Sequence, residues 1–377
     1  MNAVTQAQVS IEQFPVPEYI RAIAPYVGGK PIGEVAREFG LDEAKIIKLA
    51  SNENPLGMPQ SARDAMTRAF DEVARYPDAN GHDLKQVISR KLNVPMDWIT
   101  LGNGSNDILV LAAHAFLQPG AAAIYSQYSF VVYALATQEV GGRSVVVPAT
   151  AGFGHDLKAM LAAITPDTHL IYLANPNNPT GTYLSGAELE AFLAAVPSRV
   201  VVVLDEAYNE YLAPELKTDS VDWTRKFPNL IVSRTMSKAY GLAGLRIGYA
   251  VAQPVLTDVL NRIRQPFNVN LLAQAAAIAA LGDEEFLARS YALNRAGLIQ
   301  LCGAFDALGL PYVKPFGNFV LVKVGDAARI NLALLKRGII VRPVANYDLP
   351  EWLRISVGLP EENAAFIAAF KEVLGKA

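Results

Sequence analysis

Cysteine and histidine are scarce in this sequence. Cys302 is the single cysteine among 377 residues, which excludes an internal disulfide and a cysteine metal cluster. Four histidines are present, and none has a metal-ligand spacing to another: His82, His114, His155 and His169. We therefore expect no bound metal.

The sequence also lacks a charge excess and long apolar runs. It has 33 lysine and arginine residues against 36 aspartate and glutamate residues, a formal net charge of -3. This balance gives no reason to expect nucleic acid or an anionic membrane as a partner. The longest apolar runs, such as ILVLAAHAFL, are too short to span a bilayer, and the segment MNAVTQAQVSIEQF lacks the pattern of a signal peptide. We predict a soluble, cytoplasmic protein.

Alternating segments between residues 84 and 251 indicate the fold class. Seven apolar segments in this stretch are typical of strands, and helix-like segments separate several of them. Continuous runs such as VVVVL are characteristic of strands that are buried on both faces. Strands of this kind that alternate with helices predict an α/β fold with a mostly parallel sheet.

The pattern changes near residue 270. Alanine-rich helices such as NLLAQAAAIAALG follow, and then short strands such as NFVLVKV and WLRISVG alternate with helices. A chain of 377 residues is also longer than one ordinary domain. We therefore expect a large domain over residues 46–270, a smaller C-terminal domain over residues 271–377, and an N-terminal arm over residues 1–45 that packs on the small domain.

The polar residues that follow the predicted strands form a coherent set. In an open parallel sheet, ligands bind beyond the carboxyl ends of the strands. The segments at these ends are GNGSND (102–107), NPNNPTG (175–181), DEAY (205–208) and SRTMSK (233–238). Each alone has an ordinary explanation, such as a turn or, for Asp205, a helix N-cap. Their occurrence together at one edge favours a ligand site.

Pyridoxal phosphate is the cofactor whose needs match this set. It requires a lysine that binds its aldehyde, a carboxylate against its pyridinium nitrogen, and a phosphate site. Lys238 offers the amine, and burial and the nearby Arg246 are expected to lower its pKa. Asp205 offers the carboxylate. The glycine turn, Thr235, Ser237 and Arg246 offer phosphate contacts, since arginine binds phosphate in a bidentate manner.

The motifs NPNNPTG, DEAY, SRTMSKAYGLAGLRIGY and LRISVG, in this order, resemble those of the fold-type I aminotransferases that use pyridoxal phosphate. The similarity is greatest to the histidinol-phosphate aminotransferase group, and NENPLG (52–57) and RYPD (75–78) extend it. It covers most of the chain, and the lysine motif with its later arginine is highly specific. The resemblance implies a seven-stranded-type, mostly parallel sheet in a large cofactor domain beside a smaller α/β domain.

The resemblance also implies a role for each residue at the cofactor. Lys238 binds the cofactor covalently and moves the proton between the substrate Cα and the cofactor C4′. Asp205 pairs with the pyridine nitrogen. Tyr208 and Asn178 hydrogen-bond the phenolic oxygen, and Tyr208 joins Lys238 and Asp205 as a catalytic residue. The implied phosphate contacts are Ser105, Asn106, Thr235, Ser237 and Arg246.

The same resemblance extends to the ring face, the neighbouring subunit and the substrate. Tyr128 of YSQYSF stacks on the ring face, or Phe130 takes this place. Tyr76 of RYPD reaches the phosphate of the neighbouring subunit, so a homodimer is expected. Arg354 of LRISVG binds the substrate anion. An alternative follows from the strand itself: residues 353, 355 and 357 are apolar and share one face, which puts Arg354 on a polar face. The other residues implied around the substrate are Arg342, Tyr26 and Asn52.

Several functions fit these residues. The leading hypothesis is transfer of the amino group of histidinol phosphate to 2-oxoglutarate, a step of histidine biosynthesis. Arg342 would then be a second cation for the phosphate, but a guanidinium also packs on aromatic rings, so an aromatic amino-acid aminotransferase stays open. A lyase such as phosphothreonine decarboxylase is a further alternative, which Arg354 disfavours because it would hold the carboxylate near the ring plane. A cofactor-binding regulator would need a DNA-binding module, for which we find no basic segment.

Overall fold

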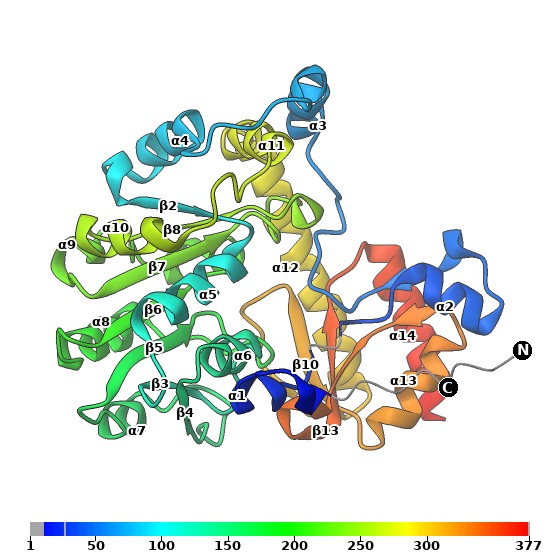
Figure 1. Ribbon diagram of the computed structural model, residues 1–377. Coiled ribbons are helices and arrows are strands. Elements are labelled where there is room, and N and C mark those ends of the chain that lie inside the picture. Colours follow the sequence, from blue (N-terminus) through cyan, green and yellow to red (C-terminus); the bar gives the residue numbers. More distant parts are fainter. Residues whose placement is uncertain (1–10, 26–27, 376–377) are drawn as a thin grey trace, which may run out of the picture.

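The computed structural model describes residues 11–25 and 28–375 and places a seven-stranded sheet beside a smaller four-stranded one (Figure 1). The large sheet has the order β2-β8-β7-β6-β5-β3-β4. Its strands are β2 (Ile99–Gly102), β3 (Ala122–Ser126), β4 (Arg143–Val147), β5 (Thr168–Ala174), β6 (Val201–Asp205), β7 (Leu230–Thr235) and β8 (Gly248–Val251). Only β8 is antiparallel to its neighbours within this sheet. The predicted α/β fold with a mostly parallel sheet is confirmed.

Helices cover both faces of the large sheet, which explains its continuous apolar strands. In β6, Val202 and Leu204 point into one core, while Val201 and Val203 point into the core on the other face. The first core includes side chains from α4 (His82–Leu92), α7 (Leu157–Ala162), α8 (Gly186–Ala195) and α9 (Trp223–Lys226). The second includes side chains from α5 (Ser105–Phe116), α6 (Val132–Glu139) and α10 (Pro254–Ile263).

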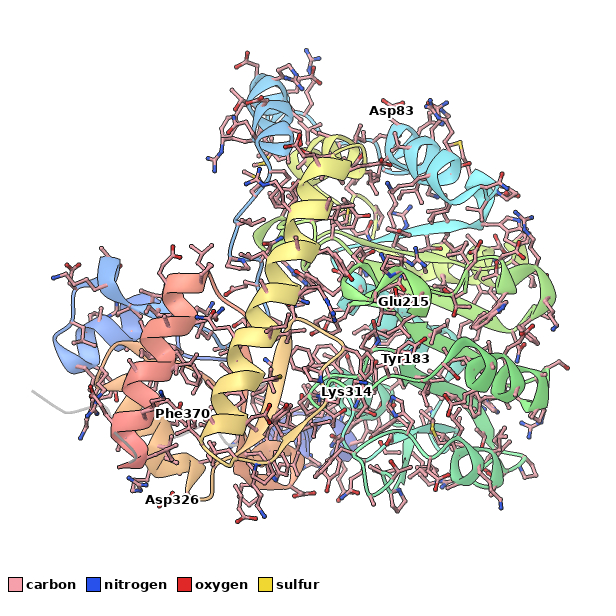
Figure 2. All side chains as sticks on the ribbon, turned by 180° about the vertical axis from the view of Figure 1, so that it is seen from behind. Asp83, Tyr183, Glu215, Lys314, Asp326 and Phe370 are labelled. Atoms are coloured by element: carbon pink, nitrogen blue, oxygen red, sulfur yellow. The ribbon has the colours of Figure 1, made fainter. Side chains whose placement is uncertain are left out.

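The smaller sheet is antiparallel and has its own core. Its order is β12 (Arg342–Val344), β13 (Leu349–Ser356), β10 (Phe319–Lys323) and β9 (Tyr312–Val313). The helices α12 (Glu284–Ala307), α13 (Ala327–Leu335) and α14 (Pro360–Leu374) pack on it. Phe370 of α14 is fully buried against Phe305 and Phe366, and α12 runs along the junction between the two sheets (Figure 2).

The segments near the predicted domain boundaries pack on one unit or the other. The helix α11 (Leu271–Leu281) packs with α3 (Gln60–Ala69) in the core of the large sheet. The helix α2 (Ile32–Phe39) packs on the small unit, where β1 (Ile47–Lys48) pairs in parallel with β11 (Ile339–Ile340). The short α1 (Glu18–Arg21) lies against α6. The division of the chain at residues 45 and 270 stays a prediction.

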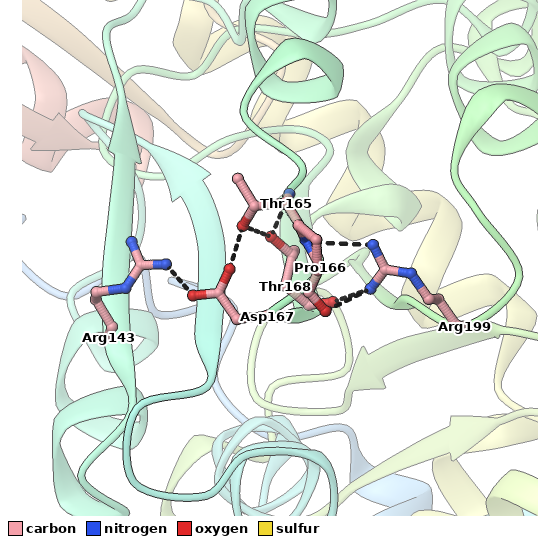
Figure 3. Close-up of polar contacts among 6 residues, drawn as sticks. All are labelled: Arg143, Thr165, Pro166, Asp167, Thr168 and Arg199. Atoms are coloured by element: carbon pink, nitrogen blue, oxygen red, sulfur yellow. Dashed lines mark hydrogen bonds and ion pairs between the residues drawn. The ribbon is translucent and has the colours of Figure 1, made fainter.

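A polar network joins the loops at the amino ends of the strands (Figure 3). Arg143, the first residue of β4, forms an ion pair with Asp167 in the turn before β5. Arg199 donates hydrogen bonds of 2.8 Å to the carbonyl oxygens of Thr165 and Thr168. Hydrogen bonding by Thr165 and the contact with Arg143 lower the pKa of Asp167 to about 2. This edge lies opposite the carboxyl ends of the strands, so the network stabilises the sheet away from the predicted site.

The described residues contain neither a membrane-spanning helix nor a candidate metal site. None of the helices within residues 11–25 and 28–375 is both long and apolar enough to cross a membrane. The same residues contain no group of three or more histidine, cysteine, aspartate or glutamate side chains that could hold a metal ion. The candidate site is the cavity at the carboxyl edge of the large sheet.

Candidate active site

A cavity lies where the carboxyl ends of β2, β5, β6 and β7 meet the small sheet. Nine of the residues expected at the cofactor line it together with four others. The full set is Ser105, Asn106, Phe130, Ala174, Pro176, Asn178, Asp205, Ala207, Tyr208, Thr235, Ser237, Lys238 and Arg246. These residues come from five separate stretches of sequence, and the parallel strands bring them to one place.

Lys238 follows β7 and directs its amine into this cavity. Its Nζ donates a hydrogen bond of 3.0 Å to the carbonyl oxygen of Ser51. Burial and the positive charge of Arg354 lower the pKa of the Lys238 amine to about 8. A larger share of the amine is therefore neutral near neutral pH than for a solvated lysine, and a neutral amine is the form that attacks a carbonyl.

Asp205 is the last residue of β6, and its carboxylate is buried at the end of the cavity. Its Oδ2 accepts a hydrogen bond of 2.8 Å from the hydroxyl of Tyr133. Its Oδ1 has no hydrogen-bond partner of normal geometry in the described part of the chain. Burial raises the pKa of Asp205 to about 6, although the nearby Ala207 backbone N–H acts on the carboxylate to lower it. A buried acceptor of this kind needs a donor, and a protonated pyridine nitrogen provides one.

The opposite end of the cavity is suited to a phosphate. Gly104 precedes α5 at a φ of 81°, and no side chain of the described chain caps this helix N-terminus. Backbone N–H groups at such an end attract anions. A Cβ at Gly104 would lie 2.4 Å from Nη2 of Arg246, so glycine is required for the guanidinium to approach the turn. Arg246 also donates to Ser237 Oγ at 3.4 Å, and the Ser237 N–H donates to Thr235 Oγ1 at 3.2 Å.

Arg354 lies on the side of the cavity that faces the small sheet. It belongs to β13 and is only 7% exposed, so it does not lie on an outer polar face of the strand. Its Nη1 donates to Asn178 Oδ1 at 2.6 Å, and its Nη2 donates to the carbonyl oxygen of Ala50 at 2.7 Å. The guanidinium is therefore held beside Asn178, at the edge of the cavity.

A chain of hydrogen bonds orients Tyr208. Ser356 Oγ accepts from the backbone N–H of Asn52 and donates to Asn52 Oδ1, both at 2.9 Å. This fixes the Asn52 amide so that Nδ2 donates to the Tyr208 hydroxyl oxygen at 2.9 Å. Because that oxygen accepts from Asn52, the proton of Tyr208 is available for an acceptor in the cavity. Burial raises the pKa of Tyr208 to about 12, so this proton is retained.

The two aromatic candidates for the ring face have different surroundings. Phe130 lines the cavity. The ring of Tyr128 instead packs against Phe153, with a centroid distance of 5.5 Å, beside the small sheet. The structure thus favours Phe130 over Tyr128 as the aromatic neighbour of a ligand in this cavity.

Two further candidates, Tyr76 and Arg342, do not line the cavity, and a third lies outside the described residues. Tyr76 is 83% exposed and stacks on Phe267, with ring centroids 4.7 Å apart. Arg342 lines a separate cavity of about 670 Å³ between the N-terminal segment and the small sheet. Tyr26 lies outside the described residues.

The structure also reveals two functional neighbours that the motifs did not indicate. Tyr133 contacts Asp205 from α6, and Ser356 contacts Asn52 across 304 positions of sequence. Tyr133 lies in none of the motifs, and Ser356 lies in LRISVG, where only Arg354 is given a role from the sequence. Ser356 follows Arg354 at alternate spacing on β13, and this is the only signal that could have singled it out.

The geometry combines an activated lysine, a buried carboxylate and an anion site around one cavity. A model of the family described as aminotransferase class I and II matches residues 44–370. The chain belongs to this family. The predicted family, fold and class of enzyme are thereby confirmed, and this aminotransferase depends on pyridoxal phosphate.

Similar proteins resemble this aminotransferase over almost their whole length. Histidinol-phosphate aminotransferase 1 of Cupriavidus pinatubonensis is 67% identical over 362 residues, which are 95% of this chain and 96% of that protein. Histidinol-phosphate aminotransferase 2 of Ralstonia nicotianae is 68% identical over 365 residues, 96% of this chain and 97% of that protein. The crystal structure of histidinol-phosphate aminotransferase from Sinorhizobium meliloti in complex with pyridoxal-5'-phosphate has a TM-score of 0.89 and 31% identity, covering 98% of this chain and 99% of that one.

The cavity of this aminotransferase fits pyridoxal phosphate. Among the described residues, Asp205 Oδ1 is a buried acceptor with no hydrogen-bond partner of normal geometry, and the N-terminus of α5 beside Arg246 is suited to an anion. Lys238 lines the same cavity. When bound, the cofactor supplies an electron sink that stabilises the carbanion left when a substrate loses its Cα proton.

Proposed function

We propose that this aminotransferase moves the amino group of histidinol phosphate to 2-oxoglutarate, which yields imidazole acetol phosphate and glutamate. The names of relatives that are 67% and 68% identical over nearly the whole chain support this substrate. An aromatic amino-acid aminotransferase is the alternative. Both activities need an anion site beside the cofactor. They differ in the rest of the substrate, since one substrate carries an imidazole ring and a phosphate and the other an aromatic ring and a carboxylate.

The pairing of two arginines supports this proposal, with Arg342 lining the separate cavity rather than the one that Lys238 lines. Arg342 of β12 and Arg354 of β13 are directly opposite across the antiparallel pair. Side chains of directly opposed residues lie on the same face of a sheet, so both guanidinium groups belong to one side of the small sheet. Arginine is the preferred partner of carboxylates and phosphates. Two cations on one face suit a substrate with a phosphate, and they equally suit the second carboxylate of 2-oxoglutarate.

In this proposal, each residue of the cavity has a separate role in amino transfer. Lys238 holds the cofactor, takes the proton from the substrate Cα and returns it at the cofactor C4′. Asp205 Oδ1 accepts from the ring N–H, and this charge keeps the ring electron-poor. Tyr208 would donate its hydroxyl proton to the phenolic oxygen of the cofactor, and Asn178, which accepts a hydrogen bond from Arg354, would contact the same oxygen.

The remaining cofactor contacts hold the ring and the phosphate in place. Phe130 covers one face of the ring, and Ala207 lines the cavity as well. Of the two aromatic hypotheses, the packing of Tyr128 on Phe153 makes Phe130 the better one. The proposed phosphate ligands are the N–H groups of Ser105 and Asn106 with the side chains of Thr235, Ser237 and Arg246.

We also propose that the enzyme is a cytoplasmic homodimer. Tyr76 is largely exposed, and its stacking partner Phe267 is exposed as well. Phe70 and Val73 add exposed apolar area in the same segment of the chain. Apolar side chains that are exposed together are typical of surfaces that another chain covers. A second copy in this place would bring Tyr76 toward the phosphate of its neighbour.

A panel of half-reactions tests the substrate. The holoenzyme is mixed separately with histidinol phosphate, phenylalanine, tyrosine, aspartate and alanine, and the absorbance change from the aldehyde to the amine form of the cofactor is followed. We expect histidinol phosphate to react with the highest kcat/KM. Faster reaction with phenylalanine or tyrosine would favour the aromatic alternative, and release of carbon dioxide would favour a lyase.

A variant of Arg342 separates the two substrate classes. Arg342→Gln removes one of the paired cations, so kcat/KM for histidinol phosphate should fall by about 10- to 100-fold, as for the loss of a charged hydrogen bond. The value for phenylalanine should change by less than about 3-fold, because it lacks the phosphate. Equal losses for both donors would show that Arg342 does not select the substrate.

A further inference from the structure

Tyr133 forms a buried cluster behind Asp205. Its side chain comes from α6, is fully buried, and donates its hydroxyl proton to Asp205 Oδ2 at 2.8 Å. The ring of Tyr133 stacks on that of Tyr172 from β5, with centroids 4.7 Å apart and planes within 1° of parallel. Tyr172 in turn donates to the carbonyl oxygen of Leu109 in α5 at 2.8 Å. Tyr133 is therefore held by packing on the covered face of the sheet.

The direction of this hydrogen bond is determined by the chemistry of the pair. Burial, followed by the negative charge of Asp205, raises the pKa of Tyr133 well above its usual value. The phenol therefore keeps its proton and donates it, and the carboxylate accepts. One oxygen of Asp205 is thus fixed toward α6, and the other, Oδ1, is left for the cavity.

We propose that Tyr133 is a positioning residue, which fixes the rotation of the Asp205 carboxylate so that Oδ1 meets the ring nitrogen of the cofactor. This inference rests on the proposed placement of the cofactor. Without the hydroxyl, Oδ2 loses its donor and the carboxylate is free to turn or to become protonated in the buried site. Through this hydrogen bond, the packing of α6 on the sheet influences the contact between Asp205 and the ring nitrogen.

The other charged and titratable groups near Asp205 do not replace Tyr133. Glu206 raises the pKa of Asp205 by its negative charge, and Lys238 lowers it from within the cavity. Tyr172 and Tyr208 act on Tyr133 through weaker electrostatic effects. Only the Tyr133 hydroxyl donates a side-chain hydrogen bond to Asp205 among the described residues.

The test compares Tyr133→Phe with Tyr172→Phe, which removes the neighbouring hydroxyl and keeps the same stack. The holoenzymes are prepared with cofactor labelled with ¹⁵N in the ring, and the ring nitrogen signal is followed against pH in the absence of substrate. In Tyr133→Phe we expect the protonated ring nitrogen to be lost at lower pH than in the wild type. The kcat should fall by about 10-fold, as for loss of an outer-shell partner, while KM for the amino donor stays within about 2-fold. Tyr172→Phe should leave the nitrogen signal and kcat unchanged.

Asp205→Asn is the reference variant for this experiment. If Asp205→Asn changes the nitrogen signal and Tyr133→Phe does not, the inference about Tyr133 is wrong and the placement of the cofactor is retained. If Asp205→Asn also leaves the signal unchanged, the placement itself is wrong. An equal effect of Tyr172→Phe and Tyr133→Phe would assign the change to the packing of the stack. The nitrogen signal needs no substrate, so a different amino donor would not affect this result.

Discussion

At the scale of single residues, the site keeps Asp205 ionised where burial disfavours the charge. The pKa of this carboxyl is raised from 3.8 to about 6 in the folded chain. The stability that the protonated carboxyl contributes to the apoprotein is therefore complete below about pH 4 and is lost as the pH rises through 6, by about 3 kcal/mol in total. Function thus requires the less stable protonation state, as is common at active sites.

Asp205→Asn should remove this penalty. We expect the apoprotein of the variant to exceed the wild type in free energy of unfolding by up to about 3 kcal/mol at pH 8, and the difference to disappear near pH 4. The kcat should fall by about 100-fold or more, because the ring nitrogen loses its charged partner. Urea unfolding of both apoproteins across this pH range measures the difference. His155, whose pKa burial lowers to about 4, titrates in both proteins and cancels. A difference that does not vary with pH would contradict the account.

Ser356 acts on the site through the Asn52 amide. Ser356→Ala removes the donor to Asn52 Oδ1 and the acceptor of the Asn52 N–H. The amide can then rotate away from Tyr208, so we expect kcat to fall by about 10-fold and the free energy of unfolding by about 1–3 kcal/mol. Ser356→Thr retains the hydroxyl and should recover most of both quantities. Steady-state kinetics and urea unfolding provide the measurements, and a variant Ser356→Ala with the wild-type kcat would argue against this role.

At the scale of elements, the start of α5 leaves no room for a side chain at Gly104. Gly104→Ala would place a Cβ 2.4 Å from Arg246 Nη2 at a φ of 81°. We expect the dissociation constant for pyridoxal phosphate to rise by about 10- to 100-fold, because Arg246 must move away from the anion site. Titration of the apoprotein with the cofactor measures this change.

Gly120→Ala is the matched control for Gly104→Ala. Gly120 has a φ of 88°, and a Cβ there would meet nothing within 4 Å. Both variants should therefore lose about 1–2 kcal/mol of stability from the backbone conformation. Only Gly104→Ala should weaken cofactor binding, and a similar loss of affinity in both would attribute the effect to strain alone.

The elements also show how far the sequence could predict the structure. The seven strands are predictable because residues such as Val202 and Val203 are apolar on both faces. Polar motifs mark the ends of four of these strands, β2, β5, β6 and β7. The antiparallel direction of β8 was not predicted, since an apolar run has no direction. Tyr133 was missed because its contact with Asp205 depends on how α6 packs on the sheet, and local sequence does not encode that packing.

At the scale of the whole molecule, contacts between the two sheets complete the site. Asn52 and Ser356 are 304 positions apart, and Arg354 reaches Asn178 over 176 positions. The family resemblance implies that Asn52, Asn178 and Arg354 belong to one site, but it predicts neither which atoms meet nor the part of Ser356. The roles of Tyr76 and of a second chain stay predictions, since Tyr76 does not line the cavity of its own chain.

A hybrid dimer tests whether Tyr76 acts on the neighbouring subunit. Chains that carry Tyr76→Ala are mixed with chains that carry Lys238→Ala, and the hybrid is isolated by two different affinity tags. If Tyr76 acts in trans, the site with an intact Lys238 receives an intact Tyr76 from the other chain. That site should bind pyridoxal phosphate with the wild-type dissociation constant. In the Tyr76→Ala homodimer, the loss of a phosphate contact should raise the dissociation constant by about 10-fold. A hybrid of wild-type and Lys238→Ala chains has one normal site and provides the reference dissociation constant. A hybrid whose single site binds as weakly as the Tyr76→Ala homodimer would assign Tyr76 to its own subunit or to no site at all, because the partner's hydroxyl would then have no effect.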